Sequence, residues 1–325
     1  MSFGVGVWSH RITDFGGEGE VETHAERLAE AGVDLIIPCV KNPPGWVDFF
    51  TERAEVDPNY PEWDPLMVLI ASCKDLGIKV HPWFCVFTEG RGSRLLAEHP
   101  EYAASLDSER RWACACRPEV QQYVLELYKD LATRYKPDGL HLDYIRTGGL
   151  CRCEYCKQEM ATQGVDVEQV RRRDPGFQRW VEWRTSRVSS FVRALHDFAS
   201  KAGLEVSAAV FADYPSCVEE QGQDWVGWSE AGIVDLLCPM NYTNSTLSVR
   251  SRTICHLSLV KGRTPIWEGL GRSSSISELT PRALSAQARS VIELGAQGFV
   301  VFHYGALTDS DLEEIRMLKR RGIDS

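Results

Sequence analysis

A short stretch near the middle of the chain places an imidazole and a carboxylate at the end of an apolar run. Residues 138–146 read Asp-Gly-Leu-His-Leu-Asp-Tyr-Ile-Arg. In a buried strand successive side chains alternate, so His141 and Asp143 share one face and the two leucines share the other. Burying both polar groups costs free energy unless they are paired or hydrated, and proteins tolerate that cost most readily where the groups perform chemistry. We therefore predict that Asp143 is catalytic; the alternative is a buried aspartate held by Arg146 or a backbone amide.

One reaction that a buried carboxylate can serve is hydrolysis of a glycosidic bond, which would require a second carboxyl group across the scissile bond from Asp143. One group is the general acid and the other is the nucleophile or base, about 5–5.5 Å apart for retention or 6.5–9.5 Å for inversion. Glu268 is the best partner because it also stands at the end of an expected strand. In this assignment Asp143 is the nucleophile or stabilising carboxylate and Glu268 is the general acid. Asp213 is the alternative partner, and the stereochemical outcome stays open.

A cluster of thiols follows Asp143 closely in the sequence. Cys151, Cys153 and Cys156 form a Cys-x-Cys-x₂-Cys array. Three thiolates at this spacing suit tetrahedral zinc, which needs a fourth ligand. Either Cys114 or Cys116, in the preceding loop, could complete the site. With four sulfur ligands the zinc would be structural; free thiols or a disulfide are the alternatives.

The elements that must position these residues follow a repeated pattern of helix, glycine and short apolar strand. Eight strands are expected, near residues 4–8, 33–40, 78–84, 139–144, 205–211, 234–239, 264–268 and 299–303. Eight apolar strands alternating with helices over 325 residues predict one (β/α)₈ barrel domain, residues 1–325. A doubly wound open sheet is the rival, but no Gly-x-Gly-x-x-Gly turn follows the first strand.

Two insertions interrupt the even spacing, at residues 88–117 after the third strand and 147–174 after the fourth. Both should emerge at the C-terminal face, where barrel enzymes build their sites. The strand ends there carry carboxylates mixed with tryptophans and tyrosines, a lining typical of carbohydrate sites. The residues predicted to bind substrate are Trp8, His10, His81, Trp83, Tyr144, Arg146, Asn241, Tyr242, Trp267, His303 and Tyr304.

The overall composition excludes several classes of partner. A net charge of −10 argues against nucleic acid, which needs a basic protein face. No apolar segment is long enough to cross a membrane. The N-terminus shows no signal-peptide pattern, so a cytoplasmic location is expected. Nothing in the sequence indicates the oligomeric state.

Three motifs together resemble the glycoside-hydrolase-like family ten barrels, which include bacterial enzymes that cut peptidoglycan glycan strands. They are the 138–146 stretch, Gln223-Asp-Trp225 with the run from Asp235 to Tyr242, and Gly298-Phe-Val-Val-Phe302. The resemblance covers most of the chain in the right order. It implies a (β/α)₈ barrel that acts on a glycosidic bond, with Asp143 matching the acidic residue that ends the fourth strand.

The thiol array is similar to that of the family forty-two β-galactosidases, whose four cysteines bind zinc. In that family the first cysteine stands a few residues before a Pro-x-x motif that opens a helix. Cys114, four residues before Pro118, matches this placement better than Cys116. Those enzymes carry an Asn-Glu pair at the end of the fourth strand, where this chain has Leu142-Asp143. Their galactosidase mechanism is therefore not expected here.

The prediction is a hydrolase that cleaves a glycosidic bond in an oligosaccharide or glycoside. The sequence names neither the sugar nor the linkage. One alternative is a sugar isomerase or lyase that uses a divalent metal held by His81, Asp143, Asp213 or His303. The other is a carbohydrate-binding barrel without catalytic activity.

Overall fold

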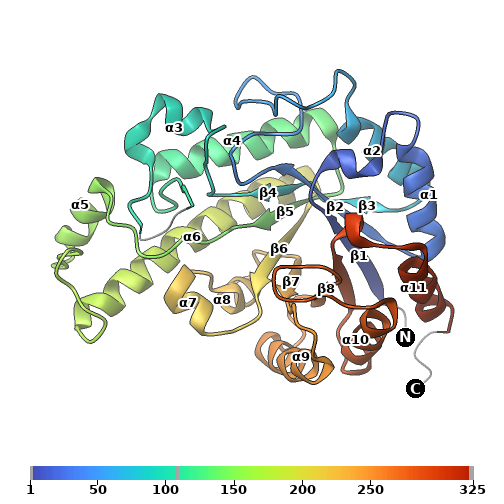
Figure 1. Cartoon of the computed structure of the whole chain (residues 1–325). Coiled ribbons are helices and arrows are strands. Elements are labelled where there is room, and N and C mark those ends of the chain that lie inside the picture. Colours follow the sequence, from blue (N-terminus) through green and yellow to red (C-terminus); the bar gives the residue numbers. More distant parts are fainter. Residues whose placement is uncertain (1–2, 107–109, 322–325) are drawn as a thin grey trace.

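The computed structural model describes residues 3–106 and 110–321, and its strands form one closed parallel sheet (Figure 1). The pairing order is β1-β9-β8-β7-β6-β5-β4-β2-β3, and a β1–β2 ladder closes it. β3 and β4 are two short pieces that both pair with β2, so nine strands fill eight positions. The predicted (β/α)₈ barrel is confirmed. The strands are β1 (Gly4–Ser9), β2 (Leu35–Lys41), β3 (Lys79–Val80), β4 (Trp83–Cys85), β5 (Gly139–Asp143), β6 (Glu205–Phe211), β7 (Leu236–Met240), β8 (Trp267–Gly271) and β9 (Gly298–Phe302).

Helices surround the sheet, and the two predicted insertions lie on the C-terminal side of β4 and β5. The first contains α3 and the second contains α5, which stands at the far edge of the molecule (Figure 1). None of the described helices is long and apolar enough to span a bilayer. The α-helices are α1 (Val21–Ala31), α2 (Pro65–Asp75), α3 (Arg94–Glu98), α4 (Pro118–Tyr135), α5 (Glu154–Thr162), α6 (Pro175–Ala202), α7 (Ser216–Gln221), α8 (Trp225–Glu230), α9 (Thr246–Val260), α10 (Pro281–Glu293) and α11 (Asp309–Arg321).

Local sequence signals set the ends of several helices. The side chain of Asp64 accepts a hydrogen bond from the Met67 amide at the start of α2, and Thr280 caps α10 in the same way. A proline follows each cap at the first helical position, where its missing N–H costs nothing. Gly32 and Gly203 end α1 and α6 with φ of 86° and 71°, which glycine adopts without a steric penalty.

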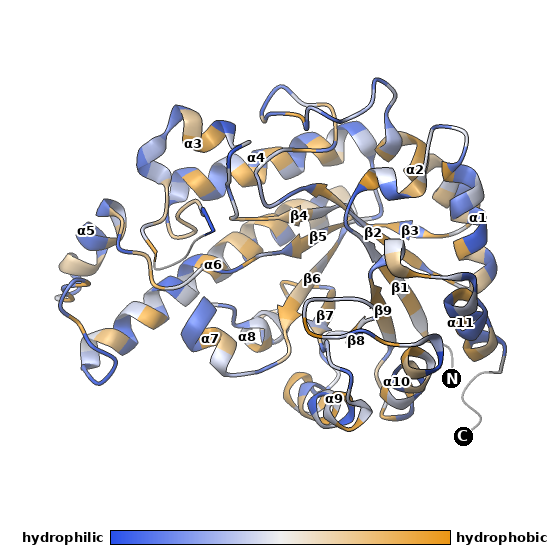
Figure 2. Ribbon diagram, viewed as in Figure 1, coloured by the Kyte–Doolittle hydropathy of each residue, from blue (hydrophilic) through white to orange (hydrophobic). Residues whose placement is uncertain are grey.

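The strands separate two hydrophobic layers, as alternation requires. On β5 the leucines pack outward against the helices, whereas His141 contacts Trp8 inside the barrel and Asp143 faces its mouth. The prediction that His141 and Asp143 share a face is confirmed. Figure 2 shows the hydrophobic colour concentrated on the strands, while the outer helices carry mixed stripes.

The strand carrying Glu268 lies further along the chain than the sequence predicted. β8 runs from Trp267 to Gly271, so Glu268 is its second residue and not its last. Glycine at 269 and 271 weakens the strand pattern at these positions. Both glycines are required by packing: a Cβ on Gly269 would lie 2.9 Å from the Trp8 ring, and one on Gly271 would lie 2.2 Å from Ser277.

Candidate active site

A cavity of about 520 Å³ opens at the C-terminal ends of the strands. Its size is in the usual range for small-molecule sites, and apolar surface predominates in its lining. Seven of the residues predicted to bind substrate reach it, together with the predicted catalytic Asp143. The lining is Trp8, His10, Cys39, Pro43, Trp83, Cys85, Asp143, Tyr144, Arg146, Ala209, Met240, Tyr242, Ser273, Ser274, Ser275, Phe302 and His303.

Asp143 is the one carboxylate among the described residues that line this cavity. It is 6% exposed, and its Oδ1 accepts a 2.6 Å hydrogen bond from the Tyr144 amide. Arg146 Nη1 lies 3.7 Å from the same oxygen, an ion pair too long for a hydrogen bond. Burial raises the pKa of Asp143, and the Arg146 charge and the Tyr144 amide oppose that rise only in part. Asp143 is therefore easier to protonate than an ordinary aspartate.

The turn after β5 fixes this arrangement. Tyr144 has a φ of 48°, a left-handed conformation that non-glycine residues seldom adopt. The Arg146 guanidinium lies over both the Tyr144 ring, at 4.3 Å, and the Phe211 ring, at 4.5 Å. Contacts of this kind stabilise a cation on an aromatic face. The aromatic pair therefore holds the positive charge beside Asp143.

Two histidines form another part of the cavity wall. The rings of His10, after β1, and His303, after β9, stack with centroids 4.2 Å apart. Burial lowers the pKa of both imidazoles. The negative charge of Asp14 raises each pKa, but by less than burial lowers it. Both are thus neutral at pH 7 and able to accept a proton.

A chain of hydrogen bonds lies beneath the cavity, inside the barrel. Trp8 Nε1 donates to His141 Nε2 at 3.0 Å, and Ser207 Oγ lies 2.8 Å from His141 Nδ1 and 2.9 Å from His81 Nδ1. An indole N–H can only donate, so His141 must carry its own proton on Nδ1 and donate it to Ser207. Ser207 then donates to His81. His81 was predicted to hold a sugar hydroxyl, but it lies fully buried below the cavity lining.

The structure does not bring Glu268 together with Asp143. Glu268 is fully buried, points outward to α9, and accepts hydrogen bonds from His256 Nδ1 at 2.7 Å and Asn241 Nδ2 at 3.1 Å. The other His256 nitrogen donates to the Ala212 carbonyl at 2.7 Å. Burial lowers the pKa of His256. Glu268 and the Ala212 carbonyl raise it by more than burial lowers it, so the pKa of His256 is raised overall. These residues form a buried ion pair between β8 and α9, and Glu268 and Asn241 lie outside the cavity lining.

Glu268→Gln is expected to destabilise the fold without lowering any catalytic activity of the folded chain. Removing one partner of a buried pair leaves the other charge uncompensated, at a cost of about 3–5 kcal/mol. Chemical denaturation would measure the loss, with exposed Glu182→Gln as the matched control. A large fall in kcat at unchanged stability would instead assign catalysis to Glu268.

Three further predicted residues lie away from the cavity. Asp213 is exposed and pairs with Arg252 on α9 at 3.3 Å. Trp267 fills the opposite end of the barrel, where Gly4 and Gly298 make room for its ring. Tyr304 stacks on Phe15 and bonds to His24.

Some lining residues were missed by sequence reasoning. Cys39, Cys85, Ala209 and Met240 face inward on their strands, and alternation from their predicted inward neighbours was the available signal. Phe302 is the last residue of the third family motif and directly precedes His303. The serines 273–275 follow β8 directly, and the misplaced strand end concealed them.

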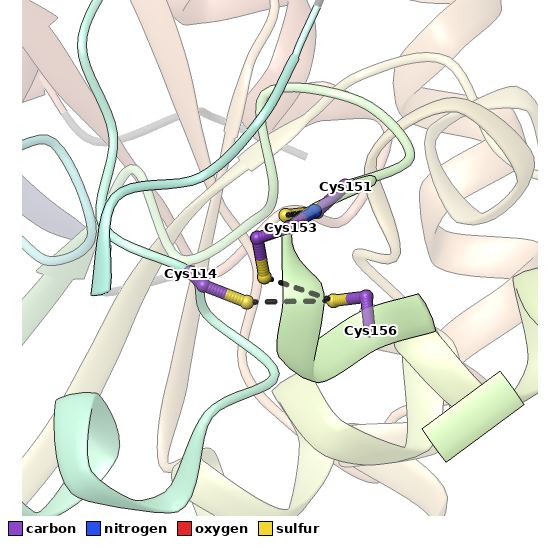
Figure 3. Close-up of side chains that lie close together, drawn as sticks. All are labelled: Cys114, Cys151, Cys153 and Cys156. Atoms are coloured by element: carbon purple, nitrogen blue, oxygen red, sulfur yellow. Dashed lines mark hydrogen bonds between the residues drawn. The ribbon is translucent and has the colours of Figure 1, made fainter. Parts of the chain in front are cut away.

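The cysteine cluster is confirmed as a candidate metal site, and Cys114 completes it (Figure 3). The Sγ atoms of Cys114, Cys151, Cys153 and Cys156 all lie within 4.8 Å of one another and are buried. Two of the separations, Cys114–Cys156 and Cys153–Cys156, are 3.5 and 3.7 Å. A tetrahedral zinc with bonds of about 2.3 Å would place its sulfurs roughly 3.8 Å apart, so the cluster fits.

Within residues 3–106 and 110–321 this is the single group of three or more potential metal ligands. The residues that an isomerase or lyase metal would need are dispersed. His81 lies under the cavity floor, Asp213 on the outer surface, and Asp143 and His303 on the cavity wall.

Comparisons with known proteins agree with this architecture. The glycosyl hydrolase DigH of Escherichia coli K12 is 22% identical over 232 residues, covering 61% of this chain and 49% of that protein. The chain thus spans about half the length of this curated relative. The PgaB (BpsB) glycoside hydrolase domain from Bordetella bronchiseptica superimposes with a TM-score of 0.79 at 15% identity over both whole chains.

A second fold relative belongs to family forty-two, the family whose thiol array resembles that of this chain. Gan42B, a GH42 β-galactosidase from G. stearothermophilus, gives a TM-score of 0.72 at 13% identity, covering 98% of this chain and 56% of that one. At these identities the structural likeness shows the fold alone. The family is shown by sequence, because the glycosyl hydrolase-like 10 model matches residues 34–260. The chain belongs to the glycosyl hydrolase-like 10 family.

Proposed function

We propose that the chain is a glycoside hydrolase that cleaves a glycosidic bond in an oligosaccharide or glycoside, with Asp143 as its central catalytic group. The observation that carries this is a single buried carboxyl in an aromatic cavity at the C-terminal mouth of a barrel. Trp8, Trp83 and Tyr242 supply ring surfaces for the CH faces of a sugar. Family membership supports a carbohydrate substrate.

The positions of these groups in the cavity and the directions of their pKa shifts support a division of roles. Asp143, whose pKa is raised, is suited to donate a proton to the leaving oxygen. His10 and His303, whose pKa values are lowered, are suited to accept a proton from the attacking water. A site can divide acid and base work between titratable groups whose pKa values its environment shifts in opposite directions. Arg146 would stabilise the carboxylate that remains after proton donation.

The four thiols would hold a zinc ion, which as a closed four-sulfur site would be structural. Cys114 belongs to the connection after β4, and the other three to the connection after β5. Both connections leave strands that contribute to the cavity, through Trp83 and Asp143. Zinc would therefore fix two walls of the site without touching substrate.

Activity is expected to follow a bell-shaped pH profile with its optimum on the acid side of neutrality. Turnover requires protonated Asp143, whose pKa lies above the ordinary 3.8, and neutral histidines, whose pKa values lie below the ordinary 6.5. Activity is lost as pH rises through the first and as it falls through the second. Profiles of kcat/KM would test this: His303→Gln should remove the acidic limb. An optimum above pH 8 would contradict these roles.

A non-catalytic carbohydrate-binding barrel is the second candidate, because the described lining offers one carboxylate where hydrolases commonly use two. Release of new reducing ends from a panel of oligosaccharides and aryl glycosides separates the two. Turnover supports the hydrolase. Calorimetric binding of a panel member without turnover supports the binding protein.

A further inference from the structure

A second cavity, of about 350 Å³, adjoins the first. Of the described residues, His10 and Pro43 alone line both cavities, so these two residues form the boundary between the first cavity and the second. The connections after β1 and β2 supply most of its wall, and Arg91, after β4, supplies one edge. A molecule bound in the first cavity could therefore extend into the second past His10.

The wall contains an aromatic ring and an arginine that pack together. Arg91 lies over the Trp46 ring at 4.9 Å, and the ring is partly exposed. The Trp46 backbone is fixed by Asn42, whose side chain accepts its N–H at 3.1 Å and whose own N–H donates to its carbonyl at 3.0 Å. A Cβ on Gly92 would lie 2.2 Å from the indole nitrogen, so residue 92 must be glycine to admit the ring. The ring is thus held firmly at the cavity.

Two carboxyl groups face this cavity, and their surroundings differ. Asp57 has partners: its oxygens accept hydrogen bonds from the Asn59 amide at 2.8 Å, Asn59 Nδ2 at 3.0 Å and Asn42 Nδ2 at 3.4 Å. Asp48 is 9% exposed, and no described residue donates a hydrogen bond to its carboxyl. Its backbone is fixed, because its N–H donates to the Val40 carbonyl at 2.8 Å.

The isolation of Asp48 is costly for the fold. Burial first, and the Asp57 charge second, raise its pKa to about 7, with Arg11 opposing them. A buried carboxyl without partners destabilises the folded state, and such groups gather in clefts where they bind or react. At this pKa Asp48 can either donate a hydrogen bond to a hydroxyl oxygen or accept one from a hydroxyl.

We propose that the second cavity binds a further sugar unit of the same substrate, with Asp48 and the Trp46–Arg91 wall as its binding groups. The substrate class is then a linear oligosaccharide of several units rather than a simple glycoside. This inference rests on the proposed function, since the first cavity must hold the neighbouring sugar. It adds a site, on the β1 and β2 connections, that the hydrolytic step itself does not use.

Calorimetry on the full chain would test it, in an Asp143→Asn background where turnover cannot deplete the ligand. The probes are chito-oligosaccharides and cello-oligosaccharides of increasing length, starting from disaccharides. Affinity should rise with length in the series that binds. Asp48→Ala should lower the affinity for the longer members about tenfold or more, as expected for a lost hydrogen bond to an ionisable group. The affinity for the shortest binding member should not change.

Two further measurements guard against a merely structural effect. Asp48→Ala should keep or raise the melting temperature, because it removes an unpaired buried carboxyl. Asp166 is exposed and lines neither cavity, so Asp166→Asn should change neither the melting temperature nor the affinity for the longer oligosaccharides. A lower melting temperature with unchanged long-chain affinity would show that Asp48 is structural and would overturn the proposal.

The outcomes also distinguish this proposal from the proposed function. Affinity independent of length would overturn the second cavity alone. Length-dependent affinity, sensitive to Asp48, would uphold the second cavity even if the unsubstituted chain turned over none of these saccharides, which would overturn only the catalytic assignment. Failure of both series to bind would overturn the saccharide assignment of both cavities.

Discussion

Asp143→Asn is expected to lower kcat about 10²–10⁴-fold, the range for losing a positioned general acid. Asparagine keeps the shape of the side chain but cannot donate the catalytic proton. Because burial already disfavours the charged form of Asp143, the melting temperature should stay the same or rise. The measurement pairs kcat on a hydrolysed oligosaccharide with thermal unfolding.

The matched control is Asp213→Asn, the same change at an exposed carboxylate held by Arg252 outside the cavity. It should leave kcat unchanged. Full turnover by Asp143→Asn would remove Asp143 from the mechanism, and a fall in kcat in both variants would restore the pairing of Asp143 with Asp213 that the sequence left open.

Loss of zinc is expected to have the second large effect, on stability. The purified chain should carry one zinc, and Cys156→Ser or a strong chelator should remove it. Buried thiolates left without a metal should cost about 3–5 kcal/mol, by analogy with other uncompensated buried charges. At roughly 2 °C per kcal/mol, the melting temperature should fall by about 6–10 °C.

Elemental analysis of three single variants tests the ligand set. Cys114→Ser should lose the metal, whereas Cys116→Ser and exposed Cys255→Ser should keep it, since neither thiol belongs to the cluster. Metal retained by Cys114→Ser but lost from Cys116→Ser would exchange the two assignments. A chain without zinc and with unchanged stability in all three would contradict the site.

The sequence predicted the scaffold because periodic patterns encode it. Glycine after several helices and proline at helix starts place the elements, and alternation within Leu140–Asp143 gives the inward face. The thiol spacing predicted the cluster because three ligands are adjacent in the chain. The spacing left Cys114 and Cys116 both open, because the contact between two connections is not a local property, and the resemblance to the family forty-two enzymes favoured Cys114, which the structure places in the cluster.

The prediction that Glu268 is the second catalytic carboxylate failed for a different reason. Glu268 was assigned to the barrel mouth because the strand was expected to end there, but the strand continues through Gly269 and Gly271, where Trp8 and Ser277 leave no room for a side chain. One misplaced strand end moved a buried structural glutamate into the predicted site and hid the serines after it. The second cavity was invisible, because the loop conformation that isolates Asp48 has no periodic pattern.

The hydrogen-bond chain under the cavity has a consequence for proton supply. Trp8 can only donate, so every bond from Trp8 through His141 and Ser207 to His81 points the same way. Passing a proton upward would require His141 to release the indole and take a charge, and burial and the neighbouring His81 already lower its pKa far below the usual value. The barrel axis therefore insulates the site from the solvent at its far end. In the proposed mechanism, the proton that Asp143 donates must therefore be replaced from the open mouth, through the same entrance that would admit the substrate.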